Sequence, residues 1–403
     1  MSVIYLDYNA TTPVDPAVKQ AMLPYFEGSF GNPSSSHALG VSAHQAVEEG
    51  RSEVARLIGA RAEEIIFTSG GTEASNLAIK GVFFARLTRG ISGWLRRAVG
   101  GESPHMVISA FEHPATSKPV EFLRKLGCLV SVVPVSREGF IDPGEVKRAL
   151  RKETILVSLM HANNEVGTIQ PIREISQITR SRGIPLHVDA AQSLGKIPTS
   201  VDELGVDLLT IAGHKLYAPK GVGALYCRSG IQLESWLHGA GHENGRRAGT
   251  ENVPYIVGLG KACQLAGESL AKDSRRLRAM TEGLWFAFRD ALGDTVALNG
   301  HLERRLPNTL NLSFVGQKGS ELLQKLPGIA ASTGSACHEG QVQQSPVLCA
   351  MGVPPEIGAG AVRLSLGRFT TDEDVSRALE LFCSALGKSP SKLHAKKGLQ
   401  TQS

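Results

Sequence analysis

The sequence predicts an α/β protein, with a large doubly wound, seven-stranded sheet domain followed by a smaller α+β domain. Short apolar runs alternate with helix-period segments over the first part of the chain, which is typical of parallel sheets with helical crossovers. From about Val253 this alternation gives way to one long helical stretch. The length of 403 residues is too great for one small core and suits two or more domains.

Seven apolar runs predict the strands of the large sheet. Most of them are β-branched, continuous and bounded by Gly, Pro or Ser, which indicates strands that are buried on both faces. The runs are Glu64–Thr68, His105–Ser109, Leu129–Val135, Ile155–Met160, Pro185–Val188, Asp207–Ala212 and Gly223–Cys227. Helices are expected between them over Thr72–Arg86, Pro119–Leu126 and Ile172–Arg182. Ligands of such a sheet bind at the carboxyl ends of its strands.

The second domain is predicted from a different pattern. Its expected elements are a helix over Val253–Leu292, strands over Asn308–Phe314, Gly328–Ser332 and Val362–Leu366, and helices from Ser320 and Thr371. We expect the large domain over residues 13–252 and the small domain over residues 1–12 and 253–387. Residues 388–403 are expected to form a disordered basic tail, and Arg86–Ser103 an exposed insertion to which no function is assigned.

The charge distribution does not indicate a nucleic-acid partner. Of the net charge of +5, four positive charges lie in the tail on Lys388, Lys392, Lys396 and Lys397, which leaves +1 for the rest. No apolar run reaches membrane-spanning length, and the N-terminus lacks the basic region and cleavage site of a signal peptide. We therefore expect a cytoplasmic protein with neither nucleic-acid nor membrane partners.

The cysteines indicate a reducing compartment. The six residues lie at positions 128, 227, 263, 337, 349 and 383, and no two form a C-x-x-C pair that would suggest zinc or a disulfide framework. Five of them lie in apolar or helical stretches and are expected in the core. Cys337 lies instead in the small, polar stretch Ser332–Gly340, where an exposed thiol beside His338 can be a nucleophile. The alternatives are an incidental surface cysteine or a zinc site, and no spaced partner ligands support the zinc site.

Lys215 is the most informative residue of the chain. It follows the apolar run Val206–Ala212 in Gly213-His214-Lys215, where a solvated surface charge is a poor explanation. Burial lowers the pKa of an amine and makes it a nucleophile toward carbonyl groups, above all that of pyridoxal phosphate. Asp189 ends another strand upstream, and a carboxylate there is the partner that the pyridinium nitrogen of this cofactor needs.

Other strand ends carry polar groups that fit such a cofactor. Ser69–Glu73 follows a strand and opens a helix, so that its glycines and free N–H groups can hold a phosphate, although a plain helix cap has the same pattern. His113 could stack on a flat ring and move protons, or could be structural. Asn164 could bond a ring hydroxyl, or could form a turn. Arg363 could clamp a carboxylate with two hydrogen bonds, or could form a salt bridge within the small domain.

Together these motifs resemble the cysteine desulfurase and selenocysteine lyase family, which consists of pyridoxal-phosphate enzymes of the class V aminotransferase fold. The resemblance covers nearly the whole folded chain, and the ordered combination of motifs is highly specific. The motifs are Tyr5–Pro13, Gly31–Ser35, Thr68–Glu73, Asn163–Gly167, Gly249–Asn252 and Arg363–Thr371. The resemblance implies a fold-type I pyridoxal 5'-phosphate enzyme that acts as a homodimer.

The resemblance also implies the roles of individual residues. Lys215 would hold the cofactor covalently and move protons, and Cys337 would be the loop nucleophile. Substrate carboxylate would be bound by Arg363 with help from Asn32. The cofactor would be bound by Gly71, Thr72, His113, Asn164, Asp189, Gln192, His214, Lys215 and, across a dimer interface, Thr250. No metal is implied.

One position departs from many relatives. A serine or threonine that binds phosphate is often found three residues before the lysine, where this chain has Ala212. One phosphate hydrogen bond is then missing, or Thr210 or a water replaces it.

The function implied is conversion of L-cysteine to L-alanine, with the sulfur taken by Cys337 as a persulfide for iron–sulfur cluster or other sulfur-containing biosynthesis. The sulfur-acceptor protein is not identified. Selenocysteine lyase activity on L-selenocysteine is the first alternative, since the motifs occur in both groups. A different aminotransferase or lyase, in which Cys337 would have no role, and a cofactor-free scaffold are the others.

Overall fold

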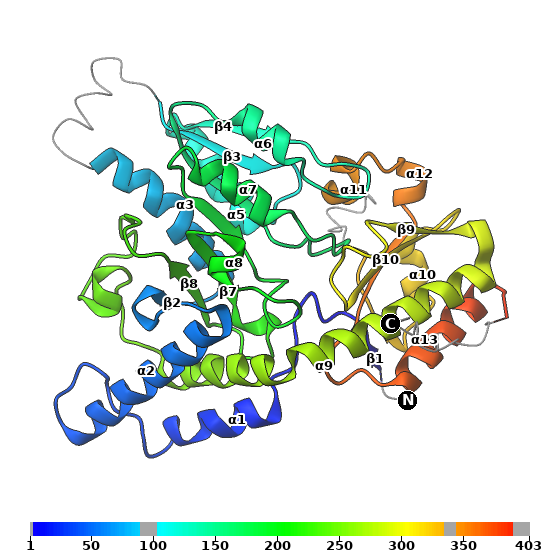
Figure 1. The fold of residues 1–403 in the computed structure, drawn as a ribbon. Coiled ribbons are helices and arrows are strands. Elements are labelled where there is room, and N and C mark those ends of the chain that lie inside the picture. Colours follow the sequence, from blue (N-terminus) through cyan, green and yellow to red (C-terminus); the bar gives the residue numbers. More distant parts are fainter. Residues whose placement is uncertain (1–2, 89–102, 334–343, 390–403) are drawn as a thin grey trace, which may run out of the picture.

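The computed structural model describes residues 3–88, 103–333 and 344–389 (Figure 1). A seven-stranded sheet has the strand order β2-β8-β7-β6-β5-β3-β4. Its strands are β2 (Ile65–Thr68), β3 (His105–Ser109), β4 (Leu129–Val133), β5 (Thr154–Met160), β6 (Leu186–Asp189), β7 (Leu208–Ala212) and β8 (Gly223–Cys227). All seven expected strands are therefore present, and the predicted α/β fold class is confirmed. β8 is antiparallel to both of its neighbours, while β3 to β7 pair in parallel.

Helices cover both faces of this sheet. On one face α3 (Gly71–Thr88) and α5 (Pro114–Lys125) pack in a cluster that contains Ile66, Met106 and Leu225. The other face carries a larger cluster, to which α2 (Ala38–Ile58), α6 (Pro143–Ala149), α7 (Ile172–Arg180) and α8 (Val201–Leu204) contribute. The sheet is thus a middle layer, as the continuous apolar runs predict.

The structure corrects two local expectations and adds two helices for which none was stated. α5 begins at Pro114, earlier than the expected Pro119, because His113 caps the helix and a proline fits its first position. β4 is the edge strand, so Leu129 and Val132 are exposed and not buried on both faces. The helices α1 (Pro16–Met22) and α2 are not predicted by the apolar pattern above.

The carboxyl-terminal part builds a second core around two small sheets. One sheet has the antiparallel order β12-β10-β9, and the other pairs β1 with β11 in parallel. These strands are β1 (Ile4–Tyr5), β9 (Val296–Asn299), β10 (Thr309–Phe314), β11 (Ile329–Ala330) and β12 (Ala361–Ser365). The helices are α10 (Gly319–Gln324), α11 (Pro346–Ala350), α12 (Pro355–Gly358) and α13 (Asp372–Ala385). β9 is not among the expected strands.

The helix α9 (Val253–Leu292) connects the two cores, as Figure 1 shows. Val253, Ile256 and Leu259 of its first half pack in the cluster beneath the large sheet, whereas Leu284 and Phe288 pack in the second core. We therefore propose that the boundary between the two domains lies inside α9, after the boundary expected at residue 252. No helix in the described part of the chain combines the length and apolar composition needed to span a bilayer.

Residues 4–12, here called the N-terminal strap, run from the second core to the large sheet. β1 pairs with β11 at the start of the strap, and the Asn9 amide donates to the Ser365 hydroxyl at 2.9 Å. At the other end the Thr12 amide donates to the carbonyl of His214 at 2.9 Å. The strap therefore lies against the segment that carries Lys215.

Four of the five cysteines expected in the core are buried, and Cys349 is not. Cys128, Cys227, Cys263 and Cys383 are buried free thiols. Cys349 lies near the end of the short helix α11 and is exposed. Most of the expected tail, at residues 390–403, and most of the expected insertion, at residues 89–102, lie outside the described residues.

Candidate active site

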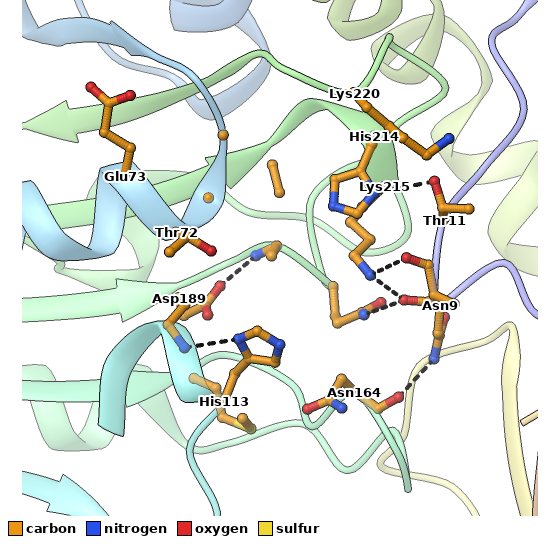
Figure 2. A pocket seen from close by; sticks show the side chains of 18 of the residues that line it. Asn9, Thr11, Thr72, Glu73, His113, Asn164, Asp189, His214, Lys215 and Lys220 are labelled. Atoms are coloured by element: carbon orange, nitrogen blue, oxygen red, sulfur yellow. Dashed lines mark hydrogen bonds between the residues drawn. The ribbon is translucent and has the colours of Figure 1, made fainter. Parts of the chain in front are cut away.

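A cavity of about 720 Å³ opens at the carboxyl ends of β5, β6 and β7. The start of α3 and the N-terminal strap form other parts of its wall (Figure 2). The site residues expected from the sequence that line it are Gly71, Thr72, His113, Asn164, Asp189, Gln192, His214, Lys215 and Arg363. The structure therefore brings together side chains that are separated by almost 300 positions in the sequence (Gly71 to Arg363).

Lys215 ends a short 3-10 turn, Gly213–Lys215, that follows β7 directly. Gly213 is needed there, because a Cβ at this position would lie 2.8 Å from the carbonyl oxygen of Val222. The Lys215 amine donates to the carbonyls of Asn9 and Ala10, the latter at 2.6 Å. Burial, and next the charge of Arg363, lower the pKa of Lys215 to about 8. About a tenth of this amine is then neutral at pH 7, far more than for an ordinary lysine, and the neutral form is the one that a nucleophile requires.

Asp189 and His113 lie near each other across the cavity from Lys215 (Figure 2). Asp189 ends β6, is 8% exposed, and accepts a hydrogen bond from the Ala191 amide at 2.9 Å. Burial raises the pKa of Asp189, and the Ala191 bond, His113 and Lys215 oppose that effect. Burial lowers the pKa of His113, while the charge of Asp189 raises it. Nδ1 of His113 accepts from the Ala115 amide at 3.1 Å, and Asp189 can present a carboxylate to a cationic ring nitrogen.

The start of α3 lies against β7 at one end of the cavity, and residues Gly70–Thr72 are here called the phosphate cradle. Gly70 has φ of +151°, and a Cβ at Gly71 would come within 3.0 Å of the Ala212 side chain. The first N–H groups of a helix have no partner inside it and favour anions. Thr72 and His214 also line this end of the cavity. Burial and the charges of Lys215 and Lys220 lower the pKa of His214 to about 4, so its ring is neutral at pH 7.

Thr210 does not replace the hydroxyl that Ala212 lacks. Its hydroxyl is 3.0 Å from that of Ser75 and 2.9 Å from Nε2 of His187, and the residue is buried within the sheet. Thr210 also does not line the cavity. Of the two replacements that the sequence leaves open, the structure rules out this one.

Gln192 and Asn164 are fixed by neighbours in the strap and in the second core. The Gln192 amide donates to the Asn9 carbonyl at 2.9 Å, and its oxygen accepts from the Lys196 amine at 2.8 Å. The carbonyl of Asn164 accepts from Arg363 at 2.9 Å. Burial lowers the pKa of Lys196 well below its ordinary value. These bonds therefore hold the Gln192 side chain and the Asn164 backbone in place on the cavity wall.

Arg363 on β12 is 6% exposed and makes two bonds on the cavity wall. Its Nη2 donates to Asp7 at 2.7 Å, and its Nη1 donates to the Asn164 carbonyl. Its buried Nε has no hydrogen-bond partner among the described residues. A fixed guanidinium with an unused N–H is suited to a carboxylate ligand.

Two of the expected site residues that the structure describes do not line this cavity. Asn32 is exposed, and its side-chain oxygen accepts from the Ser34 amide at 2.9 Å. Thr250 is exposed and lines a separate hollow of about 260 Å³. Cys337 lies outside the described residues. Within residues 3–88, 103–333 and 344–389, no cluster of His, Cys, Asp and Glu is arranged to hold a metal ion.

Several residues of the site were not assigned a role from the sequence. Asn9 and Thr11 line the cavity, and both belong to the motif Tyr5–Pro13, although nothing in that motif states which chemistry they serve. Glu112 does not line the cavity, but burial raises its pKa to about 8 and its Oε2 has no partner within the described residues. Its place directly before His113 was the available signal.

Comparisons with known proteins agree with one another. Residues 4–378 match the family described as Aminotransferase class-V. The chain is 47% identical over 380 residues to a protein named cysteine desulfurase IscS from Dictyoglomus turgidum (strain DSM 6724 / Z-1310), with 94% of this chain and 93% of that one covered. A protein of the same name from Pectobacterium carotovorum subsp. carotovorum (strain PC1) is 44% identical over 392 residues, with 96% and 93% covered. A solved structure titled NifS-like protein superposes with a TM-score of 0.86 at 35% identity, covering 96% of this chain and 100% of the other.

Proposed function

The chain belongs to the class V aminotransferase family, and on that premise we propose that it is a pyridoxal-phosphate-dependent cysteine desulfurase. The proposed reaction converts L-cysteine to L-alanine and leaves the sulfur on Cys337. The observation that carries the proposal is the amine of Lys215, with a pKa of about 8, in a cavity that also holds the buried carboxylate of Asp189. The relatives named cysteine desulfurase support the choice of substrate.

The residues present fit pyridoxal phosphate. The aldehyde of this cofactor requires an amine, its ring nitrogen requires a carboxylate, and its phosphate is bound well by an open helix N-terminus. The cavity offers a buried amine, a buried carboxylate and such a helix N-terminus. Lys215 would bind the aldehyde carbon, Asp189 the ring nitrogen, and Gly71, Thr72 and His214 the phosphate. Gln192, Asn164 and His113 would contact the ring. When bound, the cofactor supplies a ring that stabilises negative charge at the substrate α-carbon.

The remaining residues bind substrate and take its sulfur. Arg363 would bind the carboxylate of cysteine with the guanidinium that Asp7 and the Asn164 carbonyl hold at the cavity wall, and Lys215 would remove and return protons at Nζ. The thiolate of Cys337 would attack the substrate sulfur, so that an S–S bond forms while the C–S bond breaks. The electron pair of the C–S bond remains with carbon, and a proton added there completes alanine. The persulfide on Cys337 is then passed to an acceptor protein, for iron–sulfur clusters or other products.

We propose that two copies of the chain form the active enzyme. Thr250 is exposed on the surface beside a hollow that also includes Ser69, next to the phosphate cradle. A second copy would bring its Thr250 to this chain's cradle, as the resemblance implies. Asn32 is proposed to reach substrate only in this assembled form.

The free thiols of the described cysteines are compatible with the cytoplasm, where we place the enzyme.

The test is release of alanine from L-cysteine and from L-selenocysteine by the wild type, Cys337→Ala and Cys349→Ala. We expect release from cysteine by the wild type, loss of at least about 100-fold in Cys337→Ala because none of the five cysteines in the described part of the chain lines the cavity, and little change in Cys349→Ala. Cys349 is the matched control, since it is an exposed thiol on α11.

Other outcomes would point elsewhere. Release from selenocysteine alone would indicate a selenocysteine lyase. Absence of alanine from both substrates would refute the proposal and favour a different aminotransferase or lyase.

A further inference from the structure

The phosphate cradle of this chain contains few hydrogen-bond donors. Ala212 contributes no hydroxyl, and the hydroxyl of Thr210 is engaged with Ser75 and His187. Lys220 lines the cavity, but in Figure 2 its amine points away from Thr72. Ser69 also lines the cavity, but its side chain is hydrogen-bonded to Glu73, so the side-chain donors left at this end of the cavity are Thr72 and His214. The state of the His214 ring therefore matters more here than in a relative that has the extra hydroxyl.

A neutral imidazole carries only one N–H. Burial and nearby lysines keep the His214 ring neutral at pH 7. If the proton is on Nε2, the ring donates a hydrogen bond from that nitrogen, and if it is on Nδ1, Nε2 presents a lone pair that repels an anion. The location of a single proton thus decides whether His214 attracts or repels a phosphate.

Thr11 is the residue in contact with the other nitrogen. Its hydroxyl oxygen lies 3.2 Å from Nδ1 of His214, and this is its only hydrogen bond among the described residues. Figure 2 shows Thr11 on one side of the ring and Thr72 on the other, so Nε2 faces the cradle. A hydroxyl can donate to Nδ1 or accept from it. With an anion at Nε2 the ring proton lies on Nε2, so the Thr11 hydroxyl then donates to Nδ1 and stabilises that tautomer.

The backbone of the strap fixes Thr11 at this position. The phenol of Tyr5 donates to the Thr11 carbonyl at 2.9 Å, and the Thr12 amide and hydroxyl both donate to the carbonyl of His214, at 2.9 and 3.1 Å. Loss of the Thr11 hydroxyl would leave these bonds in place. The side chain can therefore be varied without detaching the strap from His214.

We propose that Thr11 is a positioning residue for the cofactor phosphate, which acts by holding the proton of His214 on Nε2. This inference rests on the proposed function, because it assumes that the cradle binds the phosphate of pyridoxal phosphate. It assigns a role to the strap that depends on one hydroxyl group and one imidazole nitrogen.

The first experiment compares the Kd of cofactor-free wild type, Thr11→Val and Thr11→Ser for pyridoxal phosphate and for pyridoxal, by absorbance titration. Valine keeps the branched shape of threonine and lacks the hydroxyl. We expect Thr11→Val to raise the Kd for pyridoxal phosphate about tenfold, as loss of a hydrogen bond to a charged group does. Thr11→Ser should restore binding, and the Kd for pyridoxal should be the same in all three proteins.

A second measurement tests the route through His214. The ¹⁵N shifts of its imidazole should report a proton on Nε2 in the wild type and a mixture of tautomers in Thr11→Val. In a His214→Ala background, Thr11→Val should have no further effect on the Kd. Thr12→Val also removes a strap hydroxyl, one that bonds the backbone of His214 and accepts from the Tyr217 amide but does not contact the ring; its ring shifts should still report a proton on Nε2.

The inference is overturned if Thr11→Val binds pyridoxal phosphate as the wild type does, or if its effect persists without His214. An equal loss for pyridoxal would also overturn it, because the hydroxyl would then act elsewhere than on the phosphate. Failure of the wild type to prefer pyridoxal phosphate over pyridoxal would be a different result, which contradicts the proposed function itself.

Discussion

The amine of Lys215 is surrounded by charged groups that move its pKa in opposite directions. Burial and Arg363 lower the pKa to about 8, while Asp7 and Asp189 raise it. Asp7 is also the ion-pair partner of Arg363, at 2.7 Å. The Asp7 carboxylate therefore orients Arg363, the proposed substrate clamp, and also opposes the lowering of the Lys215 pKa by Arg363.

This arrangement predicts the pH dependence of cofactor attachment. The rate at which the cofactor-free protein develops colour with pyridoxal phosphate should rise with pH and level off above about pH 8, as Lys215 loses its proton. In Asp7→Asn the midpoint should move to lower pH, because a group that raises the Lys215 pKa is removed. The KM for cysteine should rise about tenfold, because Arg363 loses a charge-assisted bond that orients it.

Asp290→Asn, an exposed substitution on α9, is the control for the change of charge alone. A midpoint in Asp7→Asn that stays in place or moves to higher pH would contradict the assignment.

At the residue scale, the sequence predicts groups that end buried strands. Lys215 and Asp189 are recognisable because an ionisable side chain directly after an apolar run needs an explanation. Asn9 and Thr11 lie instead in a segment without regular structure, and their place in the site depends on contacts with residues about 200 positions away. No local pattern carries that information. Lys196 also gives no local signal, since its bond to Gln192 depends on both side chains turning inward.

At the scale of elements, the closest helix crossing is that of α2 with α9. Two glycines meet there, and a Cβ on Gly260 would lie 2.6 Å from the Cα of Gly50. Ile256 is next to the same contact, because a Cβ on Gly50 would lie 3.0 Å from its carbonyl oxygen. The backbones of the two helices therefore approach without side chains between them.

Gly260→Ala should lower the free energy of unfolding by about 1–3 kcal/mol, because the added methyl group meets backbone atoms that cannot yield easily. Gly267→Ala, in the same helix, is the matched control. Its added Cβ would only touch a Leu57 methyl group at 3.6 Å, so the better helix propensity of alanine should leave the protein unchanged or up to about 1 kcal/mol more stable. Chemical denaturation of both variants is the measurement, and equal stabilities would refute the close crossing.

The elements themselves were predictable to different degrees. α9 begins and ends at the expected residues. The strands β3 and β8 match their apolar runs, because burial of every residue leaves a continuous apolar signal. β4 is more exposed to solvent than expected, since its position at an edge of the sheet is set by the order of the strands and not by its own residues. β9, at Val296–Asn299, escaped notice because only two of its four residues are buried.

At the scale of the whole molecule, three neutral histidines are buried in or beside the large sheet. His105, His161 and His187 bond serine or threonine hydroxyls, and burial lowers their pKa values to about 4, 4 and 3. In the unfolded chain such residues take up protons near pH 6.5. Below that pH the unfolded state therefore binds protons that the folded state excludes, and folding becomes less favourable.

The protein should thus lose stability as the pH falls from 6.5 toward 4. Each of the three histidines contributes up to about 1.4 kcal/mol per pH unit to this slope. His105→Gln retains a hydrogen-bonding side chain and should reduce the slope by up to that amount, as measured by urea unfolding between pH 7 and 5. Replacement of the exposed His238 by glutamine should leave the slope as it is; an equal slope in all three proteins would contradict the prediction.

The N-terminal strap has a consequence for the timing of synthesis. β1 pairs with β11, and Asn9 bonds Thr309 and Ser365, so the partners of Asn9 are made 300 and 356 residues after it. At translation rates of about 5–20 residues per second, the strap waits for about 20–70 seconds before all of these partners exist. The carbonyls that hold the Lys215 amine come into position only then, so the reactive site forms only after the strands of the second core have been made.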